Sequence, residues 1–461
     1  MDAGLRRRVV GAFMFLGVLG TMVVDVGCEQ KSPAGSAAQT APVKELVVLT
    51  PHSEAIRDAF AQGFWNWHMT NRGAPVRITW IYRGTPQCVE YVRSAADLQA
   101  QEARITKPDV MFGGGAADHS QLAAEGQCRK MDLGDVLAAI PADVNGAATR
   151  DPQGRWFATG MRSFGILYNG RACQERGIAP PATWADLADP RFCGWIALAD
   201  PVSSGSHHEC MLMILQREGW AQGWATILRV LANARALNAR SGDALRQVES
   251  GVSLATFAVN FDGMAAAAES GGALQYVDPA GATAVAPDVM SVLANTANAE
   301  LARDFVRYVL SEEGQSLWAV RRDSGTTSGA TLYHYPILPA VYEKYADRLA
   351  MPRNPLREDF GMKLDAESAA WHGALLGPVV QAACRNGNHV RLQQAWRAVI
   401  DAGLPAESLT KLTAPPLDEA GAREAATRLQ KGAAGDADGL LAEWTTALQR
   451  RYTDVLAGVR R

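Results

Sequence analysis

Short apolar segments alternate with amphipathic segments from residue 44 onward, which predicts strands and helices in turn. Residues 45–50, 76–80 and 109–112 have the length and apolar character of strands. Between the first two, apolar side chains recur at helical spacing from Ile56 to Trp67. This order is typical of a mainly parallel sheet flanked by helices, with ligands bound at the carboxyl ends of the strands.

The middle of the chain repeats the same alternation. Residues 163–168, 195–199 and 252–259 are predicted strands, and residues 206–216 and 220–231 are predicted helices. We therefore expect a second α/β lobe.

The last third of the chain changes character. Two short β-like stretches within 283–293 and a helix from about residue 299 return the chain to the first lobe, whereas beyond residue 365 the apolar residues recur only at helical intervals. Residues 404–422 carry three prolines and are expected to join two helical pieces. The expected organisation is lobe 1 at 44–162 and 283–364, lobe 2 at 163–282, and a helical C-terminal region at 365–461.

The first 28 residues have the pattern of an export signal peptide. A basic start at residues 6–8 precedes an uncharged apolar run at 9–24, which is shorter than the roughly 20 residues that a membrane-spanning helix needs. Cys28 directly follows a glycine and resembles the lipidated cysteine of a bacterial lipobox. Asp25 stands where lipoboxes favour an apolar residue, so ordinary cleavage near residues 38–41 is the alternative.

These features predict where the protein works. We expect the periplasm or cell envelope, with membrane anchoring as a lipoprotein through Cys28. Residues 29–43 are rich in Ala, Pro, Ser, Gly and Gln, which suits a flexible linker.

The composition limits the kinds of partner that the protein is expected to bind. Apolar residues make up 48% and charged residues 20%, which is typical of a globular chain. Lys plus Arg number 45 against 48 for Asp plus Glu, and no basic run follows the signal, so we expect no nucleic-acid partner.

The cysteines after Cys28 are even in number, which allows up to three disulfides in an oxidising compartment, although the sequence does not select a pairing. They are scattered without a C-x-x-C pair, which favours structural thiols or disulfides over a cysteine metal site. They are Cys88, Cys128, Cys173, Cys193, Cys210 and Cys384.

Motifs of the familiar enzyme classes are absent. The chain has no G-x-S-x-G nucleophile elbow, P-loop or H-E-x-x-H zinc motif. His207, His208 and Glu209 are adjacent, but neighbouring side chains on a helix point about 100° apart, so the two imidazoles are poorly placed to share one metal ion. We therefore expect a protein that is not an enzyme and that has no cofactor.

Five motifs in a fixed order resemble the solute-binding proteins of bacterial ABC importers, most closely the ferric-iron-binding type. They are SFGILYN at 163–169, TWADLADP at 183–190, ADPVSSG at 199–205, ESG at 249–251 and LSEEGQSLW at 310–318. The resemblance spans residues 46–319. It implies a two-lobed periplasmic-binding-protein fold, type II-like, whose lobes close over a solute, and a loaded protein that docks on ABC permease subunits. We expect a monomer.

The loop Ser203-Ser204-Gly205-Ser206 follows a predicted strand and opens a helix, where backbone N–H groups and the helix dipole favour an anion. A serine that only caps the helix is the alternative. In the resembled family the matching loop holds an anion. The run Gly113-Gly114-Gly115 also ends a strand and leaves room for close backbone approach, with a plain turn as the alternative.

The resemblance departs from its pattern at the metal site. His52 matches an iron ligand of the ferric-binding proteins, but Phe261 and Asp262 stand where those proteins have two adjacent tyrosines. A further acidic ligand of the family would fall in the glycine run at 113–115. Tight ferric binding is therefore not expected, and Fe³⁺ as cargo would depend on His52 and Asp262. Asp262 is instead expected to bind an ammonium or sugar hydroxyls, and Phe261 to stack on an apolar or ring-shaped part of the solute.

Two arginines complete the expected site. Arg83, next to Tyr82, and Arg162 lie beside predicted strands and can pair with a phosphate or carboxylate, with surface ion pairs as the alternative. The expected cargo is a small polar organic solute with an anionic group. The expected ligand-binding residues are His52, Ser53, Tyr82, Arg83, Gly113, Gly114, Arg162, Ser163, Ser203, Ser204, Gly205, Ser206, Ser241, Asn260, Phe261 and Asp262.

Two other functions stay open on sequence alone. A similar binding protein can act as a sensor that reports a solute to a membrane receptor, and neighbouring permease genes would argue against that. An exported enzyme can also use such a fold, because fold does not determine function. Turnover of the bound ligand would identify the enzyme.

Overall fold

The computed structural model describes residues 43–97, 106–322, 329–432 and 436–459. The expected signal peptide, Cys28 and nearly all of the expected linker lie outside the described residues. Within the described ranges, no helix combines the length and apolar character needed to cross a membrane.

A five-stranded mixed sheet forms the centre of lobe 1, in the order β2-β1-β3-β13-β6. β1 runs parallel to β2 and β3, whereas β13 runs antiparallel to β3 and β6. The strands are β1 (Lys44–Thr50), β2 (Val76–Tyr82), β3 (Val110–Phe112), β6 (Phe157–Arg162) and β13 (Ala286–Val292). The main helices are α1 (Glu54–Arg72), α2 (Thr85–Asp97), α3 (Ala116–Ala124), α10 (Ala299–Leu310), α11 (Glu312–Ala319) and α12 (Pro339–Lys344).

Helix α1 shows why this lobe folds as its pattern predicts. Ile56, Phe60 and Phe64 recur on one face and are buried in the core. The Phe60 ring lies 5.3 Å from that of Phe112 on β3, in an edge-to-face arrangement. The apolar stripe of the helix therefore attaches it to the sheet.

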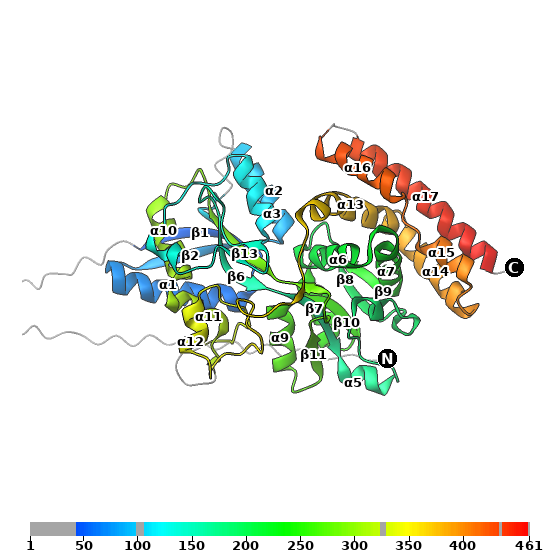
Figure 1. The fold of residues 1–461 in the computed structure, drawn as a ribbon, viewed down its shortest axis with the longest axis horizontal. Coiled ribbons are helices and arrows are strands. Elements are labelled where there is room, and N and C mark those ends of the chain that lie inside the picture. Colours follow the sequence, from blue (N-terminus) through cyan, green and yellow to red (C-terminus); the bar gives the residue numbers. More distant parts are fainter. Residues whose placement is uncertain (1–42, 98–105, 323–328, 433–435, 460–461) are drawn as a thin grey trace, which may run out of the picture. The chain divides into compact units, whose positions relative to one another are not determined.

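A second five-stranded sheet forms lobe 2, in the order β11-β7-β10-β8-β9. β10 runs parallel to β8 and antiparallel to β7. The strands are β7 (Phe164–Asn169), β8 (Ile196–Ala199), β9 (Ala234–Asn238), β10 (Ala255–Val259) and β11 (Leu274–Val277). The helices are α5 (Gly170–Glu175), α6 (Gly205–Glu218), α7 (Trp220–Asn233), α8 (Ser241–Glu249) and α9 (Asn260–Glu269). The expected α/β class with two lobes is confirmed (Figure 1).

The chain crosses between the sheets at two neighbouring segments. Ser163 alone separates β6 from β7, and the return passes from β11 through β12 (Thr283–Ala284) to β13. The Ser163 hydroxyl donates a hydrogen bond to Asp278 on the returning segment (3.0 Å), and the Thr283 hydroxyl donates to the carbonyl of Phe164 (2.6 Å). The two crossings are therefore tied together. β12 also pairs with β14 (Gly361–Met362).

The expected helical C-terminal extension is confirmed. α13 packs on α6, and α14 and α15 pack on α7, so the extension lies against the helices of lobe 2 (Figure 1). Its helices are α13 (Ala366–Cys384), α14 (Asn388–Asp401), α15 (Ala406–Thr413), α16 (Glu419–Gln430) and α17 (Asp436–Val459).

The structure contains one helix and three strands that the sequence pattern did not predict. Residues 404–422 contain the helix α15, because Pro405 stands at its N-cap and Pro415 follows its end, positions that proline tolerates. The strand β6 was not predicted, since Thr159 and Gly160 interrupt its apolar pattern. The edge strands β9 and β11 were also missed.

The short elements are β4 (Asp143–Val144), β5 (Ala147–Ala148), α4 (Asp135–Ala138) and the 3₁₀ turns Trp184–Ala188 and Pro190–Phe192. The six cysteines after Cys28 are all free thiols, so none of the disulfides that their number allows is formed.

Candidate functional site

A pocket of about 70 Å³ is lined by both lobes. All lining residues except Tyr82, Arg162 and Asp288 lie in the first turn of one of five helices, α1, α2, α6, α8 and α9, or within three residues before it. The lining residues of this interlobe pocket are Pro51, His52, Tyr82, Gly84, Thr85, Arg162, Ser203, Ser204, Gly205, Ser206, Arg240, Ser241, Val259, Phe261, Asp262 and Asp288.

The helix starts give the pocket a positive character. The N–H groups of a first helical turn lack intrahelical partners, and the helix macrodipole adds a partial positive charge at the same end. At α6, Ser204 is the N-cap, and its side chain accepts a hydrogen bond from the backbone N–H of His207. Ser204 therefore caps the helix and also lines the pocket, so the two interpretations of this loop do not exclude each other.

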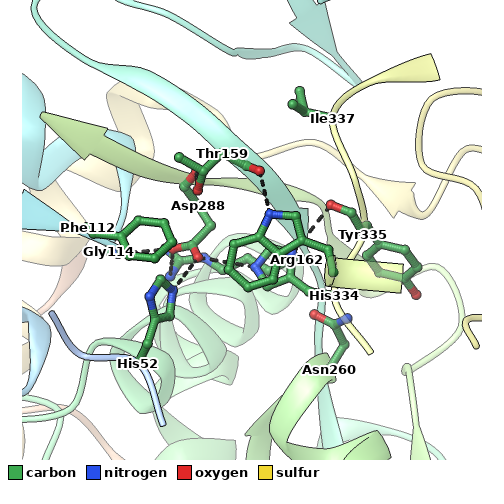
Figure 2. A network of polar contacts seen from close by, with 12 residues as sticks. His52, Phe112, Gly114, Thr159, Arg162, Asn260, Asp288, His334, Tyr335 and Ile337 are labelled. Atoms are coloured by element: carbon green, nitrogen blue, oxygen red, sulfur yellow. Dashed lines mark hydrogen bonds and ion pairs between the residues drawn. The ribbon is translucent and has the colours of Figure 1, made fainter. Parts of the chain in front are cut away.

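Asp288 is the centre of a buried polar network on the lobe 1 side (Figure 2). Its Oδ2 lies 2.7 Å from His52 Nε2 and 3.2 Å from His334 Nε2. Its Oδ1 accepts a hydrogen bond from the backbone N–H of Gly114 (3.0 Å) and lies 3.5 Å from Arg162 Nη1.

Burial alone would raise the pKa of Asp288. The charge of His52, hydrogen bonds from His334 and His52, and the charge of Arg162 together hold it well below its ordinary range. Asp288 is therefore an ionised anchor that orients His52 and Arg162 at the pocket.

The glycine run at 113–115 leaves space for this network. Gly113 and Gly114 have φ angles of 102° and 106°, which side chains rarely adopt. A Cβ on Gly113 would stand 2.7 Å from Cε1 of His52. The close approach predicted for this run is thus to the His52 ring and the Asp288 carboxylate, and neither glycine lines the pocket.

Arg162 reaches acidic groups of both lobes. A Cβ on Gly115 would lie 3.3 Å from both Arg162 Nη2 and Asp118 Oδ2, and 3.6 Å from Glu209 Oε1 on α6. Burial raises the pKa of Asp118 and of Glu209, and Arg162 opposes both shifts. The Arg162 Nε is buried and has no hydrogen-bond partner among the described residues.

Phe261 and Asp262, at the start of α9, differ in their surroundings. The Phe261 ring stacks on His334 at a centroid distance of 4.8 Å and is 8% exposed, so it covers protein and offers little surface for stacking on a solute. Asp262 lines the pocket, and among the described residues no hydrogen bond or ion pair reaches its carboxylate. Burial raises the pKa of Asp262 to about 6, and the charge of His52 opposes the shift.

The described residues contain no group of three or more His, Cys, Asp and Glu side chains that could hold a metal ion. His52, named as a candidate iron ligand, directs Nε2 at Asp288 and Nδ1 at the hydroxyl of Thr50 (3.1 Å). His207 is fully buried, and its ring nitrogens face Ser204 and Thr256.

The structure brings together most of the predicted ligand-binding residues. His52, Tyr82, Arg162, Ser203, Ser204, Gly205, Ser206, Ser241, Phe261 and Asp262 line the pocket.

The other predicted residues lie elsewhere for identifiable reasons. Ser53 is the N-cap of α1, and Arg83 is exposed, with its guanidinium donating to the carbonyl of Tyr82 (2.7 Å). The Ser163 N–H donates to the Asn260 side chain (3.0 Å), and Asn260 in turn donates to the carbonyl of Tyr333 (2.9 Å). These last two side chains connect the lobes at the crossing.

The residues missed from the sequence include Asp288, the most connected group of the site. One signal could have found it, because a lone carboxylate within the apolar strand Ala286–Val292 must be paired once it is buried. Arg240 and Gly84 also line the pocket and lie directly beside predicted residues, and Thr85 follows Gly84.

A family model described as "Bacterial extracellular solute-binding protein" matches residues 107–334. "Phosphoglycerate transport regulatory protein PgtC" of Salmonella typhimurium is 29% identical over 204 residues, which are 44% of this chain and 48% of that protein. An uncharacterized protein of Haemophilus influenzae is 27% identical over 235 residues, 50% of this chain and 67% of that protein. The chain thus spans about half the length of the first relatives that it matches.

Solved structures share the fold. The periplasmic binding protein AfuA from Actinobacillus pleuropneumoniae, with fructose-6-phosphate bound, is 19% identical and covers 78% of this chain and 99% of its own, with a TM-score of 0.57. The periplasmic binding protein P5PA is 22% identical over 69% of this chain and 94% of its own (TM-score 0.52). Iron-bound HitA from Pseudomonas aeruginosa is 19% identical over 70% and 94% (TM-score 0.51). Residues 107–334 of this chain are thus similar to the bacterial extracellular solute-binding proteins, and the chain shares the fold of periplasmic binding proteins.

Proposed function

We propose that this protein captures a small organic anion, foremost a phosphate ester, between its lobes and delivers it to the permease of an ABC importer. The observation that carries the proposal is the convergence of five helix N-termini and Arg162 on one pocket. Helix N-termini bind phosphate through free N–H groups and the macrodipole, and a guanidinium adds charge-assisted hydrogen bonds.

The charge balance of the pocket favours an organic anion over ferric iron. Asp288 already neutralises much of the charge of His52 and Arg162 within the protein, so the partial charges of the helix ends remain for the solute. The tyrosine pair of the ferric-binding proteins is replaced by Phe261 and Asp262. Fe³⁺ as cargo is therefore the weaker alternative.

The curated relative adds support for a phosphorylated solute. Its name assigns PgtC to phosphoglycerate transport, and phosphoglycerate is a small organic anion of the proposed class. The fructose-6-phosphate bound to AfuA is also a phosphate ester, although at 19% identity that likeness concerns the fold.

Solute entry requires the lobes to separate. The pocket volume of about 70 Å³ is well below the ~300–1,000 Å³ of common small-molecule sites, so this arrangement suits the closed form. Hinge motion at the two crossings between the lobes would open the pocket.

The site of action and the partners remain part of the proposal. The family is extracellular or periplasmic. We expect this protein in the cell envelope, anchored through a lipid on Cys28, acting as a monomer with permease subunits as partners.

A second function is favoured by one observation, the word "regulatory" in the name of PgtC. A binding protein that reports its solute to a membrane receptor would use the same pocket. Stimulation of a permease's ATPase activity by the loaded protein would support import, whereas signalling without transport would support the sensor.

The proposal is tested by thermal unfolding of the protein with 3-phosphoglycerate, fructose-6-phosphate, glucose and ferric citrate. Ligands that bind the native state raise Tm by mass action. We expect at least one phosphate ester to raise Tm, and Arg162→Ala to reduce that shift. Arg191→Ala is the matched control, because Arg191 is exposed, lies outside the pocket lining and pairs with Asp189. A shift with ferric citrate alone would overturn the proposal.

A further inference from the structure

We propose that the solute carries, besides its anionic group, a hydrogen-bond donor that binds the Asp262 carboxylate. The donor is a hydroxyl or an ammonium group. This inference rests on the proposed function and narrows it to bifunctional solutes.

The inference begins with the contrast between the two carboxylates that line the pocket. Asp288 has His52, His334, Arg162 and the Gly114 N–H as partners. Asp262 has no hydrogen bond and no ion pair within the described part of the chain. Its side chain is only partly buried, so water can solvate the carboxylate in the free protein, and a solute that displaces this water must supply the missing hydrogen-bond donor.

The charges around Asp262 favour such a donor. Glu249 and Asp288 both add negative potential at its carboxylate, and His52 is the opposing positive group. A second anionic group of the solute would be repelled here, whereas a hydroxyl hydrogen or an ammonium would be attracted.

The rest of the pocket offers the opposite chemistry. The starts of α6 and α8 present backbone N–H groups together with the hydroxyls of Ser206 and Ser241. One small pocket therefore combines donors for an anion with one free acceptor. A solute with an anionic group alone, such as inorganic phosphate or an alkyl phosphate, would leave Asp262 without a partner.

The test uses three phosphate esters of similar size. Propyl phosphate has no donor on its chain, glycerol 3-phosphate carries hydroxyls, and phosphoethanolamine carries an ammonium. Their Kd values are measured by titration calorimetry at pH 7.5 for the wild type, Asp262→Asn and Asp262→Ala. Asp135→Asn is the matched control, because Asp135 also lies in a first helical turn and its side chain is 87% exposed.

We expect the wild type and Asp135→Asn to bind one donor-bearing ester about 10- to 100-fold more tightly than propyl phosphate, the range for a hydrogen bond to a charged group. Both Asp262 variants should lose this preference, so that each binds the three esters with similar affinity. A preference for glycerol 3-phosphate identifies the donor as a hydroxyl, and a preference for phosphoethanolamine identifies an ammonium.

Two further outcomes separate the failure of this inference from that of the proposed function. Equal affinity of the wild type for all three esters would contradict the proposed hydrogen-bond donor but not the proposed anion site. An equal loss of affinity for all three esters in the Asp262 variants would mean the same. Binding of none of the esters by the wild type would overturn the phosphate ester as cargo and this inference with it. Circular dichroism of each variant establishes that it is folded.

Discussion

The two lobes contribute chemically different faces to the interlobe pocket. On the lobe 1 side, His52, Arg162 and Asp288 pair with one another inside the protein. On the lobe 2 side, the start of α6 and Asp262 present groups that await a partner. The polar groups of lobe 1 are therefore already paired in the free protein, whereas those of lobe 2 would find their partner in the solute. Apart from Arg162, which is also proposed to contact the solute, substitutions on the lobe 1 face should lower stability, and those on the lobe 2 face should lower affinity.

The largest effect is expected for Asp288→Ala. The substitution leaves Arg162 without its buried counter-charge and removes a hydrogen-bond partner of His52 and His334, and breaking a buried ion pair costs about 3–5 kcal/mol of the free energy of unfolding. Urea unfolding of the solute-free protein measures the loss. Asp135→Ala, at an exposed position, should leave the midpoint unchanged. A loss below about 1 kcal/mol for Asp288→Ala would mean that the network does not stabilise lobe 1.

Gly113→Ala tests the same face through the backbone. Its φ of 102° is unfavourable for alanine, and the new Cβ would collide with the His52 ring at 2.7 Å. We expect a loss of about 2–3 kcal/mol, at the upper end of the usual cost of backbone strain. Gly73→Ala is the matched control, since Gly73 also has a positive φ but nothing lies within 4 Å of its Cβ position. Equal losses of unfolding free energy in the two variants would show that the clash with His52 does not contribute.

Ser206→Ala tests the lobe 2 face of the pocket. Its hydroxyl lines the pocket at the start of α6, so its removal should weaken binding of a phosphate ester about tenfold while the Tm of the free protein stays unchanged. Calorimetry and thermal unfolding measure the two quantities. Ser250→Ala, an exposed serine at the end of α8, should change neither. Should Tm fall and affinity hold, this loop would have only a structural role.

The smallest effect is expected from pH. Burial raises the pKa of Asp262 to about 6, so acidification from pH 7.5 to 5 should protonate it and weaken a donor-bearing solute about three- to tenfold. Because this folded-state pKa lies above the unfolded value, Asp262 contributes stability to the free protein below about pH 4 that is lost as pH rises through 6. Asp262→Asn should abolish the dependence of stability and leave only the part of the affinity change that comes from the solute's own phosphate, whose second pKa is about 6.

Asp288 behaves in the opposite way, since its pKa is depressed. Its stabilising contribution is present above pH 3.8 and is lost only as pH falls through its folded-state pKa. The Asp288 network should therefore remain intact between pH 5 and 7.5. Unfolding of lobe 1 within that window would contradict this assignment.

Much of the fold could be predicted because strands and helices leave local patterns. The buried face of α1 and the ordered series of strands and helices in each lobe follow from hydrophobic spacing alone. The strand β6 was missed because Gly160 and Thr159 dilute its pattern. Gly160 is needed for packing against a distant residue, since a Cβ there would stand 2.6 Å from Cε1 of His334.

The candidate site was predictable where one segment carries its own chemistry. The serine loop at 203–206 and the replacement of the tyrosine pair by Phe261 and Asp262 are visible in the sequence, and all these residues line the pocket. The expected stacking of Phe261 on a solute could not be corrected from sequence, because His334, which covers the ring, is distant along the chain.

Local sequence patterns suffice to predict the α/β class with two lobes, the helical C-terminal region and the helix start of the proposed anion site, because each depends on neighbouring residues. Which groups the proposed solute can reach depends on contacts between distant parts of the chain. His52 and Asp288 are 236 residues apart and meet when β13 inserts between β3 and β6. Because a buried charge is neutralised by whichever partner the fold brings within hydrogen-bond distance, the Asp288 carboxylate is already paired inside the protein. Asp262 is then the carboxylate of the pocket lining that is available to a solute.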